Sequence, residues 1–283
     1  MPSLSDVMTP DAAKLAAQAA AGQSAPGQAP APASQGDLYE FLLRMGDSTL
    51  ILGHRVSEWC GHSPVLEEDI ALANVALDLI GQTQMWLGYA GEVEGKGRDA
   101  DKLAYLRDAH EFRNALLTER PNGDFGMTLM RQFLFDAYQF VLLGKLESSS
   151  DPRVAEIAVK ARKEVSYHLE RSRDMVVRLG DGTAESHKRM QDALDELWSY
   201  TGEMFLADSV DEAMAKAGVA PNPADLKAAW SAIVDETLAE ATLKKPAGTY
   251  AHKGGKKGVH SEYLGHLLAQ MQFLQRAYPG AVW

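Results

Sequence analysis

The residues best suited to chemistry lie near the middle of the chain. Asp136 and His168 each stand among apolar residues, in segments whose periodicity predicts long helices. In helical bundles that bind two irons through carboxylates, two helices carry Glu-x-x-His, which places both ligands on the inward face. Val165 occupies the glutamate position of such a motif before His168. The segment therefore resembles half of a metal site.

No histidine of the chain completes this motif. The residue three positions before each of the 8 histidines is neither Glu nor Asp, whereas a di-iron bundle needs two such pairs. We therefore expect Asp136 to be buried and hydrogen-bonded to a neighbour such as His168, because an unpaired buried carboxylate is costly. Glu164, one turn before His168, is either a substitute ligand or an exposed residue that pairs with surface lysines.

A second candidate site is the loop at residues 253–258, which consists of glycine and lysine residues. Glycine lets backbone amides face an anion, and lysine adds positive charge. Lys253, Lys256 and Lys257 are therefore candidate contacts for a phosphate group or for a partner protein, and the alternative is an ordinary solvated loop. The loop lacks the Gly-Lys-Ser/Thr ending of a P-loop, and the chain has no Gly-x-Ser-x-Gly motif for serine catalysis.

Composition limits the other classes of function. The 283 residues are 46% hydrophobic, which is enough for one large core, and the net charge of −11 gives no support for nucleic-acid binding. The apolar runs are too short to cross a bilayer, and no secretory signal is evident. Cys60 is the only cysteine, which excludes an internal disulfide framework. We expect a cytosolic protein that binds neither nucleic acid nor membrane.

Helical periodicity dominates the chain from Asp37 onward, and no alternating strand pattern interrupts it. Residues 1–36 are a low-complexity tail, and residues 37–283 form one all-α domain whose core is four long antiparallel helices. Asp37 and Glu40 are expected to form the capping box of the first helix. The expected helices span residues 37–60, 66–89, 101–119, 124–147, 152–180, 184–216, 225–243 and 262–277.

The spacing of apolar residues in the second of these helices, residues 66–89, predicts the set that faces the core. That set comprises Ile70, Ala73, Leu77, Ile80 and Trp86.

Several longer motifs, in order along the chain, resemble a known family. The motifs are LLRMGD (42–47), SEWCGHSP (57–64), LAN (72–74), LDLIGQ (77–82), GGKKG (254–258) and MQFLQR (271–276). The resemblance covers residues 37–283 and points to the C subunits of the phenylacetyl-CoA 1,2-epoxidase complex, the monooxygenase of aerobic phenylacetate degradation.

The resemblance implies a ferritin-like four-helix bundle with additional helices. It also implies a structural, non-catalytic role beside a related A subunit, which carries the di-iron centre and binds the acyl-CoA. A small B subunit and a flavin/iron–sulfur reductase complete the system. No cofactor is expected in this chain.

The ligand pattern of the A subunit can be placed on this sequence. Only Asp136 and His168 keep ligating side chains, so the resemblance implies that the metal site is a relic. The alternatives are a metal-binding or catalytic ferritin-like subunit with unusual ligands, and an acyl-CoA-binding module that acts through the basic loop. The six matching positions are Thr49, Leu79, Gln82, Asp136, Val165 and His168.

Overall fold

The computed structural model describes residues 33–248 and 250–281, and these residues form helices and loops without a β-strand. The prediction of an all-α fold is confirmed. The predicted tail falls outside the described residues except for its last four positions. The helices are α2 (Gln35–Ser57), α3 (Leu66–Glu94), α4 (Ala100–Tyr105), α5 (Phe125–Leu146), α6 (Pro152–Gly180), α7 (Ala184–Leu197), α8 (Ser209–Lys216), α9 (Pro223–Glu240), α10 (Glu262–Met271) and α11 (Phe273–Ala277).

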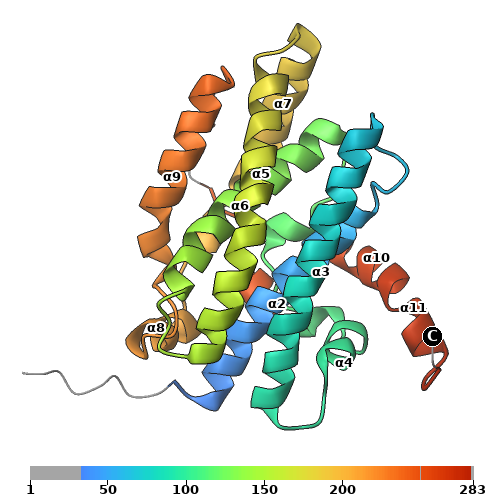
Figure 1. The fold of residues 1–283 in the computed structure, drawn as a ribbon, viewed down its shortest axis with the longest axis vertical. Helices are drawn as coiled ribbons and strands as arrows, with labels where there is room; N and C mark the ends of the chain where they lie inside the picture. Colours follow the sequence, from blue (N-terminus) through green and yellow to red (C-terminus); the bar gives the residue numbers. More distant parts are fainter. Residues whose placement is uncertain (1–32, 249, 282–283) are drawn as a thin grey trace, which may run out of the picture. The chain divides into compact units, whose positions relative to one another are not determined.

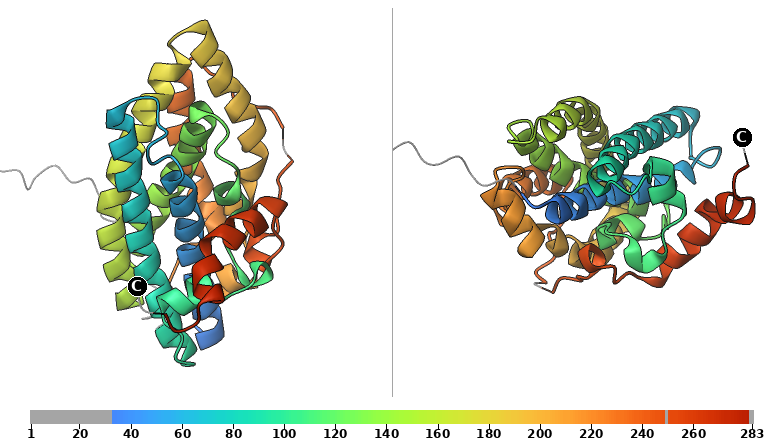
Figure 2. Two further views of the ribbon diagram at one scale, coloured as in Figure 1. Left: turned by 90° about the vertical axis from the view of Figure 1, so that its right-hand side faces the viewer. Right: turned by 90° about the horizontal axis from the view of Figure 1, so that it is seen from below.

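Four long helices form the bundle predicted from the sequence. Helix α2 packs along α3, and α5 packs along α6, with each pair joined by a short connection (Figure 1). Helix α2 is buried almost continuously from Phe41 to Gly53, because neighbouring elements cover it on every side. The remaining helices cover the open faces and ends of these two pairs (Figure 2). None of the helices within the described ranges is long and apolar enough to span a membrane.

Local capping explains where helices α2 and α6 begin. The Ser34 hydroxyl accepts a hydrogen bond from the Asp37 amide at 3.1 Å, so α2 starts two residues before the predicted position and the expected Asp37–Glu40 capping box is wrong. Asp151 caps α6 and Pro152 occupies its first turn, as the sequence predicts.

The inward face predicted for α3 is wrong for most of its residues. Trp86 is buried, but Ile70 and Leu77 are 53% and 69% exposed. The core side of the helix is formed instead by Leu72, Val75 and Leu79, among others. Helix α3 is apolar on two faces, so periodicity alone could not select the one that packs inside.

The helix expected at residues 101–119 ends at Tyr105. Two short 3-10 turns, η1 (Ala109–Glu111) and η2 (Leu116–Glu119), follow it. Side chains from other elements accept hydrogen bonds from the backbone amides here: Asp47 from Arg113, and Glu203 from Leu116. These tertiary contacts replace the intrahelical bonds that an α-helix would provide.

The helix expected at residues 184–216 is also interrupted. Helix α7 ends at Leu197, and the 3-10 turns η3 (Trp198–Tyr200) and η4 (Gly202–Phe205) lead to α8. Asp208 caps α8 by accepting bonds from the amides of Val210 and Asp211. The last expected helix is likewise divided, into α10 and α11.

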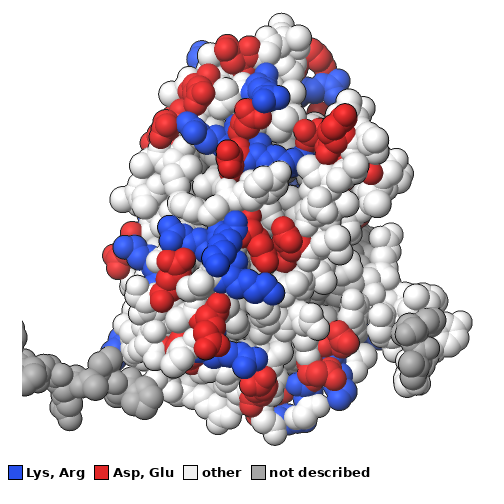
Figure 3. Space-filling model, viewed as in Figure 1, with Lys and Arg blue, Asp and Glu red and all other residues white. Residues whose placement is uncertain are grey.

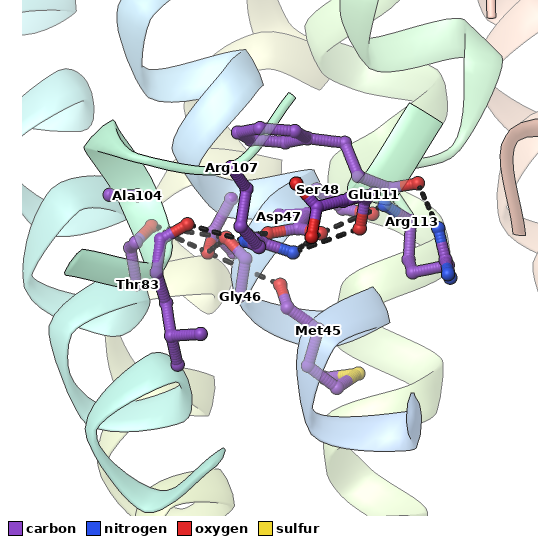
Figure 4. A network of polar contacts seen from close by, with 12 residues as sticks. Met45, Gly46, Asp47, Ser48, Thr83, Ala104, Arg107, Glu111 and Arg113 are labelled. Carbon is purple, nitrogen blue, oxygen red and sulfur yellow. Dashed lines mark hydrogen bonds and ion pairs between the residues drawn. The ribbon is translucent and has the colours of Figure 1, made fainter. Parts of the chain in front are cut away.

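A buried ion pair attaches the irregular segment after α4 to the bundle (Figure 4). Asp47 of α2 is fully buried, and the Arg107 guanidinium contacts both of its carboxylate oxygens, with Nη1 at 3.0 Å from Oδ2. The Arg113 amide donates to the same Oδ2 at 2.8 Å. Gln272, between α10 and α11, donates to the Arg107 carbonyl at 2.9 Å. The carboxylate of Asp47 therefore joins the segment after α4 to α2, and the Gln272 bond connects the C-terminal helices to the same segment.

Replacing Arg107 with alanine should leave the Asp47 charge buried without its cation. We expect the free energy of unfolding to fall by about 3–5 kcal/mol, measured by denaturant titration. Lys188→Ala, which removes an exposed pair with Asp192, is the matched control and should cause no measurable change. Equal effects of the two substitutions would show that the Asp47 pair is not a structural anchor.

Candidate functional site

The six positions of the implied metal site lie inside the bundle. They come from the four core helices α2, α3, α5 and α6, and none is more than 2% exposed. The positions implied by the resemblance are thus all buried, including Leu79 and Gln82, which were not part of the inward face predicted for α3. They are Thr49, Leu79, Gln82, Asp136, Val165 and His168.

The expected hydrogen bond between Asp136 and His168 is not formed. Asp136 accepts bonds from Gln132 Nε2 at 2.6 Å and from Ser172 Oγ at 2.8 Å. His168 Nε2 lies 3.0 Å from Oδ2 of Asp78 on α3. The two residues therefore have separate hydrogen-bond partners.

The structure agrees with neither prediction for Glu164, a substitute metal ligand or an exposed residue paired with surface lysines. It is half-buried, and its Oε2 accepts a hydrogen bond from Gln82 Nε2 at 3.0 Å. Gln82 occupies a histidine position of the ligand pattern. Its bond to Glu164 is an amide–carboxylate contact between α3 and α6. Glu164 thereby pairs with the core and not with a surface lysine.

The side chains at these positions do not fit a di-iron centre. Leu79 and Val165 have no ligating atoms, and the Thr49 hydroxyl lies 2.8 Å from Thr83 Oγ1 and contacts the Met45 and Gly46 carbonyls. A di-iron bundle needs four carboxylates and two histidines. Within residues 33–248 and 250–281, no three His, Cys, Asp or Glu side chains come together in a way that could hold a metal ion.

Burial raises the pKa of Asp136 to about 6, and the nearby His168 and the bonds from Ser172 and Gln132 only partly offset this effect. The carboxyl group is thus costly to ionise in this interior.

In the basic loop, the glycine amides face an anion that belongs to the chain itself. Residues 255–257 form the 3-10 turn η5 (Gly255–Lys257). The amides of Gly254 and Gly255 donate to Oε1 of Glu203 at 2.6 and 2.8 Å, and the Leu116 amide donates to Oε2 at 2.9 Å. Glu203 is 3% exposed. An internal carboxylate therefore occupies the position considered for a phosphate.

The three lysines of the loop have different surroundings. Lys256 Nζ lies 2.8 Å from Asp211 Oδ2 and 2.9 Å from the Leu206 carbonyl, so its charge is used within the chain. Lys253 and Lys257 are exposed, and both line an open cleft of about 500 Å³ beside Leu206. Only these two lysines present their charge toward solvent.

Comparison with known proteins agrees with this architecture. Residues 20–283 match the family described as phenylacetic acid catabolic protein. The chain belongs to this family. The C subunit of the 1,2-phenylacetyl-CoA epoxidase of Escherichia coli (strain K12) is 48% identical to it over 246 residues, which are 87% of this chain and 99% of the relative.

Three buried carboxylates bind groups of the chain itself, and the sequence analysis did not identify them. Asp47, Glu119 and Glu203 are all at most 3% exposed. Glu119 Oε2 lies 2.8 Å from Nδ1 of His260, and its Oε1 accepts from the Ser261 amide. Burial opposes a charge on His260, but the Glu119 carboxylate raises the pKa of this histidine above its usual value. Their partners are distant in sequence, so no local spacing could have identified them.

The cost of ionising Asp136 predicts a pH dependence. Its pKa is 3.8 in a model peptide and about 6 in the folded chain. Between these values the folded state binds a proton that the unfolded state has lost, so stability decreases as the pH rises. We expect Asp136→Asn to stabilise the chain relative to wild type at pH 7.5 by up to about 3 kcal/mol, and much less at pH 4.5. A difference that is independent of pH in thermal unfolding would contradict this.

The role of Glu203 can be tested by removing its carboxylate. Glu203→Ala leaves three amide donors without acceptors, and we expect the free energy of unfolding to fall by about 3 kcal/mol. Lys253→Ala in the same loop should leave stability unchanged, because that side chain is exposed. If Glu203→Ala were as stable as Lys253→Ala, the loop would not depend on this carboxylate.

Proposed function

We propose that the chain is a structural, non-catalytic subunit of a cytosolic phenylacetyl-CoA 1,2-epoxidase in aerobic phenylacetate degradation. It supports an A subunit that carries the di-iron centre and binds the acyl-CoA, together with a small B subunit and a flavin/iron–sulfur reductase. The 48% identity to the C subunit of such an epoxidase supports this assignment.

The observation that carries the proposal is the donor set in the bundle. Of the six ligand positions, only Asp136 and His168 keep side chains of the type that binds iron in this architecture, and both are hydrogen-bonded to protein groups. The bundle is retained while its ligands are replaced, as expected for a vestigial metal site in a protein that contributes its surface and not its chemistry.

The alternatives have less support in the geometry. A metal-binding subunit with unusual ligands would need further donors near Asp136 and His168, and Leu79 and Val165 provide none. An acyl-CoA-binding module would need the loop amides, which bind Glu203. Lys253 and Lys257 are the remaining candidates for contact with CoA phosphates or with an acidic partner surface.

The proposal predicts the behaviour of the purified chain. Alone, it should contain no stoichiometric iron by elemental analysis and should not oxygenate phenylacetyl-CoA. Co-expressed with the A subunit, it should elute in one joint peak on size-exclusion chromatography, because a stable complex buries more than about 1,000 Å². Asp136→Ala serves as a control, since it should not change the iron content of the isolated chain. Near-stoichiometric iron that is lost in this variant would overturn the proposal.

A further inference from the structure

Helix α3 presents a row of aliphatic side chains to solvent, opposite the face that packs into the bundle. The four residues recur at helical spacing, so they lie along one side of the helix. Single exposed aliphatic residues are common on protein surfaces, whereas a contiguous apolar row marks an interaction surface. The row, called here the α3 outer row, consists of Leu66 (69% exposed), Ile70 (53%), Leu77 (69%) and Ile80 (38%).

The outer row continues in small and uncharged residues. Gly81 and Gly88 follow on the same side of α3, with Gln84 between them. A Cβ atom added at either glycine would meet nothing within 4 Å, so the chain's own packing does not require them. Glycine weakens a helix interior relative to alanine, but its lack of a side chain lets a second backbone approach closely. These glycines therefore favour a close-packed partner helix over exposure to water.

Charge is scarce along this part of the surface. In Figure 3 the middle of α3 lies in a mostly uncharged area, whereas lysine, arginine and acidic residues gather over α6 beside it. In a chain with 24% charged residues, an uncharged row of this length favours a partner that is apolar where it makes contact.

The size of the surface also indicates a protein partner. From residue 66 to residue 88 the helix extends about 33 Å, and at about 10 Å in width the row covers roughly 330 Å². A stable interface buries about 800 Å² on each side, so neighbouring elements must contribute. The outer row thus has the dimensions of an interface centre.

We propose that the α3 outer row is the docking surface for a helix of the catalytic A subunit. This inference rests on the proposed function, because it assigns the face through which that partner binds. A second copy of the chain is the less favourable occupant, since each copy carries a net charge of −11 and the two would repel each other. A helix of a different chain with an apolar contact face would cover the row.

A charge placed in the row tests the assignment. Leu77→Arg should weaken binding to the purified A subunit at least tenfold, measured by analytical ultracentrifugation, because the arginine must be desolvated on docking. The matched control is Val159→Arg on α6, another helical aliphatic residue that is 42% exposed, and it should bind as wild type does. Both variants should melt at the wild-type temperature, since neither side chain is buried.

A larger side chain at Gly81 tests the docking surface independently of the stability of the fold. Gly81→Leu should keep or raise the melting temperature of the isolated chain, yet weaken binding of the A subunit at least tenfold by blocking backbone approach.

If wild type binds the A subunit and both row variants bind equally well, the docking assignment is overturned while the proposed function stands. If wild type does not bind the A subunit at all, the proposed function itself falls. If Leu77→Arg instead abolishes self-association of the wild-type chain, the row binds a second copy and the assignment to the A subunit is overturned.

Discussion

The structure depends on the buried ion pair between Asp47 and Arg107. Asp47 lies in the middle of the central helix α2, where an unpaired carboxylate would cost several kcal/mol. Arg107 and the Arg113 amide together neutralise and solvate it. These bonds hold the irregular segment after α4 against the bundle. Gln272, between the two C-terminal helices, in turn donates to the Arg107 carbonyl of this segment.

The same arrangement recurs at two other buried carboxylates. Glu119 binds His260 and the Ser261 amide, and Glu203 binds the amides of Leu116, Gly254 and Gly255. Each carboxylate connects segments that are far apart in sequence. Gly258, at φ +76°, completes the loop at a site where a side chain would collide with the His110 carbonyl. Some of the acidic residues of the chain therefore connect its own segments.

The centre of the bundle is organised differently. Its ligand positions hold leucine, valine, threonine and glutamine beside Asp136 and His168, and the polar groups bond to nearby protein atoms. These contacts join the four core helices to one another. A subunit that supports a complex would have this interior together with an apolar outer face on α3. A helix exposed to solvent would usually carry charged residues on that face.

The sequence by itself determined the helical class, the bundle helices and the loss of the Glu-x-x-His motifs, because helix periodicity and ligand spacing are local properties. The bounds of α6 agree with the range of residues 152–180 expected from the sequence. Only the tertiary structure decided which face of α3 turns inward, since both faces are apolar. It also decided that residues 106–119 leave the helix and that Lys256 and the loop glycines bind internal carboxylates. Those partners lie 45 to 52 residues away for the loop, so no local pattern encodes them.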